Sequence, residues 1–147
     1  MDFKQLEHIL LVEDTEDHIE HTLDALDEGS LVNEVKVVKD GQAALDYVFH
    51  RGEFTDLEAA PRPGLILLDV KLPKVSGFQV LEAIKADPDL KIIPVIILTT
   101  TGNEEDIERG ARLGANDYII KPVEFETFVQ KVKGLGKYWA LISDLAR

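Results

Sequence analysis

Short apolar runs alternate along the chain with segments whose apolar residues recur at helical spacing. The apolar runs lie at residues 8–12, 34–38, 65–68, 95–98 and 118–120. Helical periodicity marks residues 15–27, 77–86 and 104–113, a segment after the Asp40-Gly41 turn, and a segment from about residue 124. Five strand–helix units in succession predict an α/β fold with a parallel sheet.

The predicted strands are mainly apolar, and those at residues 65–68 and 95–98 contain no polar position. That pattern is typical of strands that helices bury on both faces. We therefore expect a doubly wound, five-stranded parallel sheet in a single domain over residues 1–147. Residues 50–64, before the third predicted strand, are longer than the usual connection of about 2 to 6 residues. We interpret them as an insertion or a functional loop.

The last predicted helix keeps apolar residues at helical spacing almost to the end of the chain. If it is unbroken over residues 124–146, it is about 35 Å long at ~1.5 Å per residue. Gly134 and Gly136 are positions at which such a helix can bend or break. The sequence thus predicts an extension of the C-terminal helix at about residues 137–147.

Composition is typical of a globular protein that folds as one domain. The 147 residues are 45% hydrophobic and 30% charged. A formal net charge of −12 disfavours binding to nucleic acid or to anionic lipid. The lack of cysteine excludes disulfides and zinc–thiolate sites, and no apolar run reaches the ~20 residues of a membrane span. We expect a cytoplasmic protein with no nucleic-acid or membrane partner.

Polar residues follow three of the predicted strands. Glu13 and Asp14 come after the first strand, Asp69 after the third and Thr99 after the fourth. Open α/β sheets bind ligands in the crevice at the carboxyl ends of their strands, so we expect these side chains to lie together. Three neighbouring carboxylates repel one another, and hard oxygen ligands suit Mg²⁺. The sequence predicts a magnesium site at Glu13, Asp14 and Asp69.

Lys121 follows the fifth predicted strand and directly precedes Pro122. Its ammonium can reach a phosphoryl oxygen in the crevice as a point charge, and Thr99 can donate a hydroxyl hydrogen bond to the same group. A carboxylate beside a bound cation can attack phosphorus and form an aspartyl phosphate, and Asp69 is best placed for this. The Lys121–Pro122 bond is a candidate for the cis form, which is confined almost wholly to proline.

Each of these residues also has a simpler interpretation. Acidic residues after a strand often only complement the positive end of the next helix, and a Lys-Pro pair often only ends a loop. The common register of Asp69, Thr99 and Lys121 favours the functional interpretation. His18 and His21 are three residues apart on the first predicted helix. They can be imagined as metal ligands, but we expect both to be solvated helix positions.

Four stretches of the chain together carry a family resemblance. They are Glu13-Asp14, residues 69–77 (DVKLPKVSG), Leu98-Thr99 and residues 114–122 (GANDYIIKP). They resemble the receiver domain of two-component response regulators, and the likeness covers nearly the whole chain. Asp69 lies 30 positions before Thr99 and 52 before Lys121, the spacings of that family. The 55 positions from Asp14 to Asp69 exceed the usual number by about the length of the segment at residues 50–64.

The resemblance implies a flavodoxin-like sheet with strand order 2-1-3-4-5 and a signalling protein rather than an enzyme. It implies that Asp69 accepts a phosphoryl group from the phosphohistidine of a sensor histidine kinase. The receiver catalyses this Mg²⁺-dependent transfer itself and then loses the phosphate slowly. Asp14 ligates Mg²⁺, Glu13 assists mainly through water, and the backbone carbonyl of Lys71 is a further protein ligand.

The resemblance also implies how the phosphoryl group is bound and sensed. Thr99 and Lys121 bind its oxygens. Tyr118 turns inward as Thr99 moves, which changes the surface formed by the fourth helix, the fifth strand and the fifth helix. This is a two-state switch that a local charge event biases.

The segment at residues 50–64 and the apolar tail resemble a narrower group, the small single-domain regulators that pair with bacterial and cyanobacterial phytochromes. The tail residues that carry this likeness are Tyr138, Trp139, Leu141 and Ile142. The resemblance implies a phytochrome as the partner kinase and no output domain. It also implies a homodimer with Tyr138, Trp139 and Ile142 at the interface.

Three other functions are weaker. A degenerate receiver that only binds proteins is disfavoured, because every acidic and phosphate-contact position is filled. A haloacid-dehalogenase-like phosphatase needs a second acid two residues after its nucleophile, where this chain has Lys71. A flavodoxin-like cofactor protein binds phosphate with hydroxyls and backbone amides after the first strand. Here Glu13, Asp14, Glu16 and Asp17 would repel it.

Overall fold

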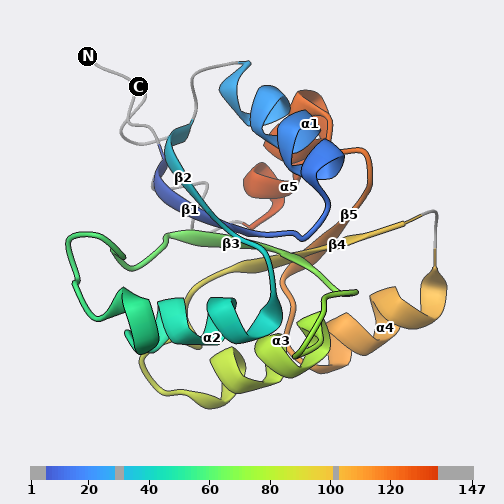
Figure 1. Ribbon diagram of the computed structural model, residues 1–147. Helices are drawn as coiled ribbons and strands as arrows, with labels where there is room; N and C mark the ends of the chain where they lie inside the picture. The colour runs from blue at the N-terminus through green and yellow to red at the C-terminus, as the bar shows by residue number, and fades with distance from the viewer. Residues whose placement is uncertain (1–5, 29–31, 101–102, 136–147) are drawn as a thin grey trace.

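The computed structural model describes residues 6–28, 32–100 and 103–135. These residues form one sheet of five strands, all parallel, in the order β2-β1-β3-β4-β5 (Figure 1). The predicted strand order and direction are confirmed. The strands are β1 (Leu6–Val12), β2 (Val32–Val38), β3 (Leu65–Asp69), β4 (Val95–Thr99) and β5 (Asp117–Ile120).

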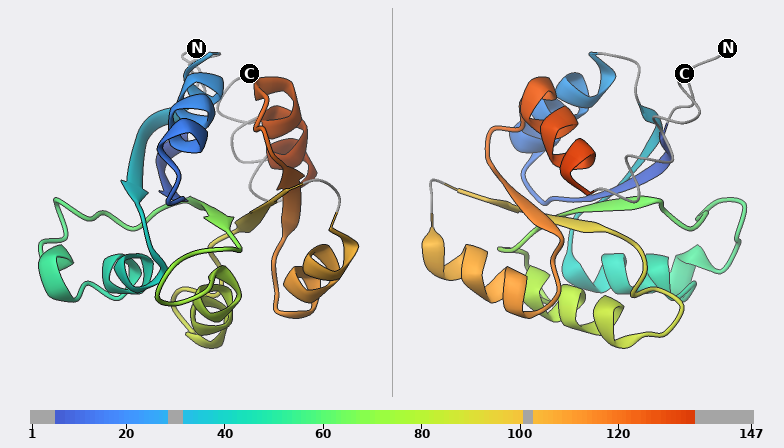
Figure 2. Two further views of the ribbon diagram at one scale, coloured as in Figure 1. Left: turned by 45° about the vertical axis from the view of Figure 1, so that its right-hand side comes forward. Right: turned by 180° about the vertical axis from the view of Figure 1, so that it is seen from behind.

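Helices cover both faces of the sheet, as Figures 1 and 2 show. On one face lie α1 (Glu16–Asp27) and α5 (Phe125–Gly134). The other face carries α2 (Gly41–Val48), α3 (Gly77–Ala86) and α4 (Glu104–Arg112). The sheet therefore lies between two helical layers, which confirms the predicted doubly wound fold.

Successive residues of the inner strands pack into the two layers in turn. Leu10 and Leu68 belong to the core against α2 and α3, whereas Leu11 and Leu67 belong to the core against α1 and α5. Every residue of β3 and β4 is buried. Because full burial of a leucine or isoleucine contributes roughly 1.5–3 kcal/mol, these continuous apolar runs hold both layers to the sheet.

The long segment at residues 50–64 is folded back onto α2. It contains one short 3₁₀ helix, η1 (Gly52–Phe54), whose Phe54 ring lies 5.2 Å from that of Tyr47. The Tyr47 hydroxyl donates to the carbonyl oxygen of Pro61 at 3.0 Å, and Ala60 is fully buried. The segment leads into the amino end of β3, the edge of the sheet opposite Asp69. The segment therefore lies away from the edge at which Asp69 ends its strand, and whether it is an insertion or a functional loop stays a prediction.

The last helix begins at Phe125, close to the predicted start, and ends at Gly134, one of the two glycines at which a break was expected. The predicted continuation to residue 146 lies outside the described residues. So do the predicted interface residues Tyr138, Trp139 and Ile142. Within the described ranges, none of the helices combines the length and apolar character needed to cross a bilayer.

Candidate functional site

Four strands deliver polar side chains to one edge of the sheet. Asp69 and Thr99 are the last residues of β3 and β4, and Glu13 and Lys121 come directly after β1 and β5. All these strands are parallel, so their carboxyl ends lie at the same edge. The structure thus brings together the residues that the sequence predicted to share a crevice.

The loop after β3 holds Asp69 in place. A Cβ atom on Gly77 would lie 2.1 Å from the carbonyl oxygen of Asp69, so only glycine lets α3 start this close to the strand end. The Gly77 N–H donates to the carbonyl oxygen of Val70 at 3.1 Å. Ser76 then caps α3 by accepting from the backbone N–H of Gln79. This packing fixes the backbone that carries the Asp69 carboxylate.

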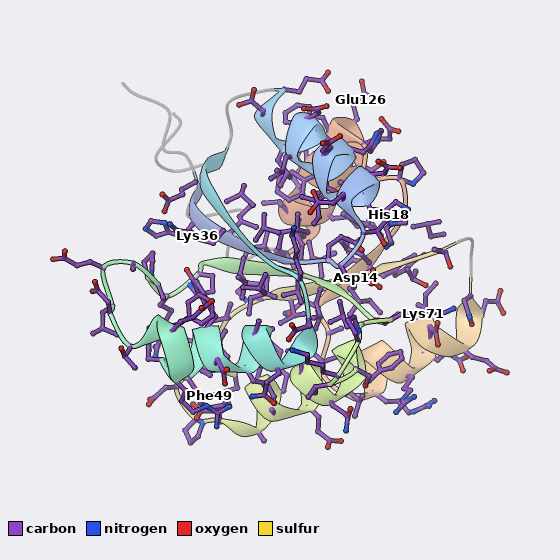
Figure 3. All side chains as sticks on the ribbon, in the orientation of Figure 1. Asp14, His18, Lys36, Phe49, Lys71 and Glu126 are labelled. Atoms are coloured by element: carbon purple, nitrogen blue, oxygen red, sulfur yellow. The ribbon has the colours of Figure 1, made fainter. Side chains whose placement is uncertain are left out.

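Three carboxylates converge at this edge. One oxygen from each of Glu13, Asp14 and Asp69 lies within 4.8 Å of the other two. Glu13 is fully buried and Asp69 is 5% exposed, whereas Asp14 lies at the surface. Figure 3 shows Asp14 and Lys71 on the same side of the molecule, and both line a cavity of about 210 Å³ together with Asp69. This set of hard oxygen donors fits a divalent cation.

Lys121 is the counter-charge of the cluster. Its ammonium donates to Asp69 Oδ2 and to Glu13 Oε1, each at 2.7 Å, and its side chain is 8% exposed. The second oxygen of Glu13 accepts from the backbone N–H groups of Asp14 at 3.1 Å and Thr15 at 3.3 Å. The sequence predicted that Lys121 would face the crevice but did not predict its bond to Glu13. The Lys121–Pro122 bond is cis, as the sequence suggested.

The charges shift the pKa values of the buried groups. Burial raises the pKa of Glu13 from 4.5 to about 7, and the neighbouring Asp69 carboxylate adds to the rise while Lys121 opposes it. Burial alone would lower the pKa of Lys121, but its bonds to Asp69 and Glu13 outweigh that and raise it. The hydrogen bond from Lys121 therefore only partly offsets the effects of burial and of Asp69 on the pKa of Glu13.

Thr99 is the last residue of β4, whereas Tyr118 lies two residues before the end of β5. Thr99 is buried and lines the same cavity as Asp69, and its hydroxyl donates only a marginal bond to the carbonyl oxygen of Thr100 at 3.5 Å. Tyr118 lies instead beside a second cavity of about 210 Å³, which Ile97 also lines. The Lys131 ammonium lies 4.1 Å from the centre of the Tyr118 ring. The two expected switch residues therefore line separate cavities.

His18 is a site residue that the sequence did not identify. Its Nδ1 lies 3.2 Å from the Lys121 ammonium and 3.7 Å from Glu13 Oε1. The imidazole is 45% exposed, so the expectation of a solvated position was correct but incomplete. His21 points to Glu124 at 3.7 Å and forms no metal-binding cluster with His18 among the described residues. The signal that could have identified His18 was its position in the sequence. A helix that starts just after Asp14 brings the residues of its first turn to this edge of the sheet.

Comparison with known proteins agrees with this geometry. The family model described as "Response regulator receiver domain" matches residues 9–133. The response regulator Rcp1 of Synechocystis sp. is 39% identical over 131 residues, which are 89% of this chain and 87% of Rcp1. These matches cover the strands and helices that form the site.

Solved structures give the same result. The bacteriophytochrome response regulator RtBRR is 46% identical with a TM-score of 0.81 over 90% of this chain and 79% of its own. The phosphorylated cyanobacterial phytochrome response regulator RcpA is 41% identical with a TM-score of 0.75 over 93% and 95% of the two chains. A Mn²⁺-bound structure of Rcp1 is similar with a TM-score of 0.72 over 90% and 93%.

Proposed function

This chain belongs to the response regulator receiver domain family and is homologous to phytochrome response regulators, and from that premise we propose that Asp69 is its phosphoacceptor. In the proposal the chain works as a single receiver domain in a two-component pathway. The phosphoryl group comes from the phosphohistidine of a sensor histidine kinase. The receiver supplies the groups that promote the transfer and later lets the phosphate hydrolyse slowly.

The observation that carries the proposal is the way the Asp69 carboxylate is held. The backbone N–H of Lys71 donates to Oδ1 at 2.8 Å, and the Lys121 ammonium donates to Oδ2 at 2.7 Å. These two bonds fix the rotation of the carboxylate at the wall of a cavity that Thr99 also lines. A nucleophile fixed in orientation needs less reorganisation to reach the geometry of attack.

The proposed step transfers phosphorus from nitrogen to oxygen. One oxygen of the Asp69 carboxylate attacks the phosphorus of the donor's phosphoimidazole, and the new O–P bond forms as the N–P bond breaks. The leaving imidazole nitrogen takes the bonding electron pair and then a proton from water. The product is an aspartyl phosphate, and nothing is oxidised or reduced.

A divalent cation fits the acidic cluster, and we propose Mg²⁺. Asp14, Asp69 and the backbone carbonyl of Lys71 would hold it, with Glu13 assisting mainly through water. The cation would supply positive charge next to the phosphoryl oxygens. The support from this chain is that one carboxylate oxygen from each of Glu13, Asp14 and Asp69 lies within 4.8 Å of the other two.

In the proposal, the remaining site residues bind the phosphoryl group of the product and transmit its presence to the surface. Lys121 would contact one phosphoryl oxygen, and Thr99 would give up its marginal bond to donate to another. Movement of Thr99 would let Tyr118 turn inward and change the surface of α4, β5 and α5. The cavity beside the Tyr118 ring supports this switch, because it provides space for the ring to move.

The partner and the assembly extend the proposal. Bacteriophytochrome and cyanobacterial phytochrome response regulators are similar to this chain, so we propose a phytochrome as the kinase and the cytoplasm as the location. The tail is proposed to stabilise a homodimer through Tyr138, Trp139 and Ile142. Truncation before Tyr138 should then turn a dimer into a monomer in light scattering. A monomeric intact chain whose mass per particle is unchanged by truncation would contradict the dimer.

Phosphorylation by acetyl phosphate in the presence of Mg²⁺ tests the proposal. Intact-mass spectrometry should show one added phosphoryl group on the wild type and none on Asp69→Asn or after chelation of the metal. Asp46→Asn is the matched control, because Asp46 is a carboxylate on α2 whose side chain bonds Gln42. Phosphotransfer from a phytochrome kinase and from an unrelated kinase then tests the partner.

The degenerate receiver is the alternative that this experiment excludes or supports. It predicts no added mass under any condition and no effect of Asp69→Asn on partner binding. The filled positions at Asp14, Asp69, Thr99 and Lys121 argue against it, because a module that only binds proteins has no need for three converging carboxylates.

A further inference from the structure

The Lys121 ammonium has a third neighbour on the open side of the site. Besides Glu13 Oε1 and Asp69 Oδ2, each 2.7 Å away, it lies 3.2 Å from Nδ1 of His18. His18 belongs to the first turn of α1, and Figure 3 shows it on the same side of the molecule as Asp14 and Lys71. Its imidazole lines the cavity that contains Asp69 and also an adjoining cavity of about 370 Å³.

The chemistry of the two groups decides the direction of this contact. An ammonium has three N–H donors and no acceptor, so Nδ1 of His18 must accept and the imidazole proton must be on Nε2. The alternative is a protonated His18 that donates from Nδ1 to Glu13. That alternative is weaker, because the distance to Glu13 Oε1 is 3.7 Å and this oxygen already accepts from Lys121.

The three acceptors together fix the rotation of the ammonium. With one N–H on Glu13, one on Asp69 and one on His18, each donor of Lys121 has a defined direction. When Asp69 becomes an aspartyl phosphate, one N–H must turn from the carboxylate to a phosphoryl oxygen. Glu13 and His18 keep the other two N–H groups in place, so only one hydrogen bond of the ammonium has to change as the phosphoryl group arrives.

We infer that His18 is a positioning residue, whose Nδ1 orients the Lys121 ammonium toward the phosphoryl group during transfer to Asp69. This inference rests on the proposed phosphoacceptor function. It assigns to α1 an indirect part in the chemistry at the sheet edge, through the hydrogen bond between His18 and Lys121.

Three variants of the full chain test the inference with acetyl phosphate as the donor. His18→Leu keeps similar bulk and removes the acceptor, so phosphorylation of Asp69 should slow by about 3- to 10-fold, the size expected for one lost hydrogen bond. His18→Asn places an amide oxygen near the position of Nδ1 and should restore the rate to within about twofold of the wild type. His21→Leu makes the same exchange three residues along α1 and should leave the rate unchanged.

The rates are compared at equal Mg²⁺ and checked by circular dichroism for intact folding. A His18→Leu rate equal to that of the wild type would overturn the inference. So would a His18→Asn rate as slow as that of His18→Leu, because the effect would then come from ring shape and not from the acceptor. An equal loss in His21→Leu would show a general effect of substituting α1 and would also overturn it.

A second measurement separates this inference from the proposed function. If the wild type takes up no phosphate, the proposed function fails, and ¹⁵N NMR of His18 still tests the contact without any phosphate. An unprotonated Nδ1 whose resonance shifts on Lys121→Met supports the contact. A protonated Nδ1, or a resonance that Lys121→Met does not move, refutes it.

Discussion

Replacement of Lys121 with methionine is the sharpest test of the buried charge cluster. The substitution keeps most of the side-chain volume but removes the ammonium that lies 2.7 Å from both Glu13 and Asp69. The Lys121 side chain is 8% exposed, and the two carboxylate side chains are 0% and 7% exposed. Removing one partner from a buried ion pair typically costs about 3–5 kcal/mol, because the remaining charge stays buried and uncompensated. We expect a loss of about 3 kcal/mol in unfolding free energy at about pH 8 without metal.

The loss should depend on pH in a defined direction. The ammonium lowers the pKa of Glu13, so its removal moves that pKa further above about 7. Between about pH 8 and pH 6 the mutant then gains more from protonation of Glu13 than the wild type does. Since one pH unit of differential protonation is worth about 1.4 kcal/mol, the destabilisation should be smaller by about 1 kcal/mol at the lower pH.

Urea unfolding followed by circular dichroism in the presence of a chelator measures both quantities. Lys131→Met is the matched control, because its ammonium also pairs with a carboxylate, Asp117 Oδ1 at 2.9 Å, but both side chains are about a quarter exposed. Such a pair contributes at most about 1 kcal/mol. A Lys121→Met loss no larger than that of Lys131→Met, or a loss that grows as the pH falls, would refute the reasoning.

Two further predictions concern the same edge of the sheet. The pKa of Glu13 is raised from 4.5 to about 7 by folding. Between these two pH values the folded protein binds one proton that the unfolded chain has released. The stability contribution is therefore complete below about pH 4.5 and is lost as the pH rises through 7, by about 3 kcal/mol in chelator. Glu13→Gln should flatten this slope in urea titrations, and an equal slope in both proteins would contradict the assignment. Gly77→Ala should cost about 2 kcal/mol or more in unfolding free energy, since its Cβ would lie 2.1 Å from the carbonyl oxygen of Asp69. Gly134→Ala, with nothing within 4 Å of the added Cβ, should change the unfolding free energy by less than about 1 kcal/mol, and similar losses in both would contradict this account.

The sequence predicted the parts of the site that depend on strand ends. Apolar runs buried on both faces identify inner parallel strands, and the residue after each run must then lie at the ligand-binding edge. Asp69 and Thr99 were located in this way, and Lys121 was located by its place directly after the edge strand β5. The fold could be predicted equally well, because apolar strands and the helical periodicity of amphipathic helices are strong signals in the sequence.

The hydrogen bonds between side chains across the crevice could not be predicted from the sequence in the same way. Lys121 and Glu13 are 108 positions apart, and their bond depends on rotamers and burial that no sequence period records. The contact of His18 with Lys121 spans 103 positions and depends on how α1 leaves the loop after β1. The segment at residues 50–64 was ambiguous for a related reason. Its attachment to α2 depends on the hydrogen bond from the Tyr47 hydroxyl to the carbonyl oxygen of Pro61, which composition does not predict.

In the proposed mechanism, charge balance requires a divalent cation at the site together with the phosphoryl group. Three carboxyl groups face the single ammonium of Lys121, so acidic groups are in excess at the site, and burial with a further contribution from Asp69 raises the pKa of Glu13 to about 7. A phosphoryl group that carries about −1.5 to −2 charges on Asp69 deepens this excess, and the single ammonium of Lys121 cannot offset it. In the proposed mechanism a bound cation would offset the charge of the phosphoryl group. Lys121 would then exchange the Asp69 carboxylate for a phosphoryl oxygen, and Thr99 and Tyr118 would transmit this exchange of hydrogen bonds to the surface.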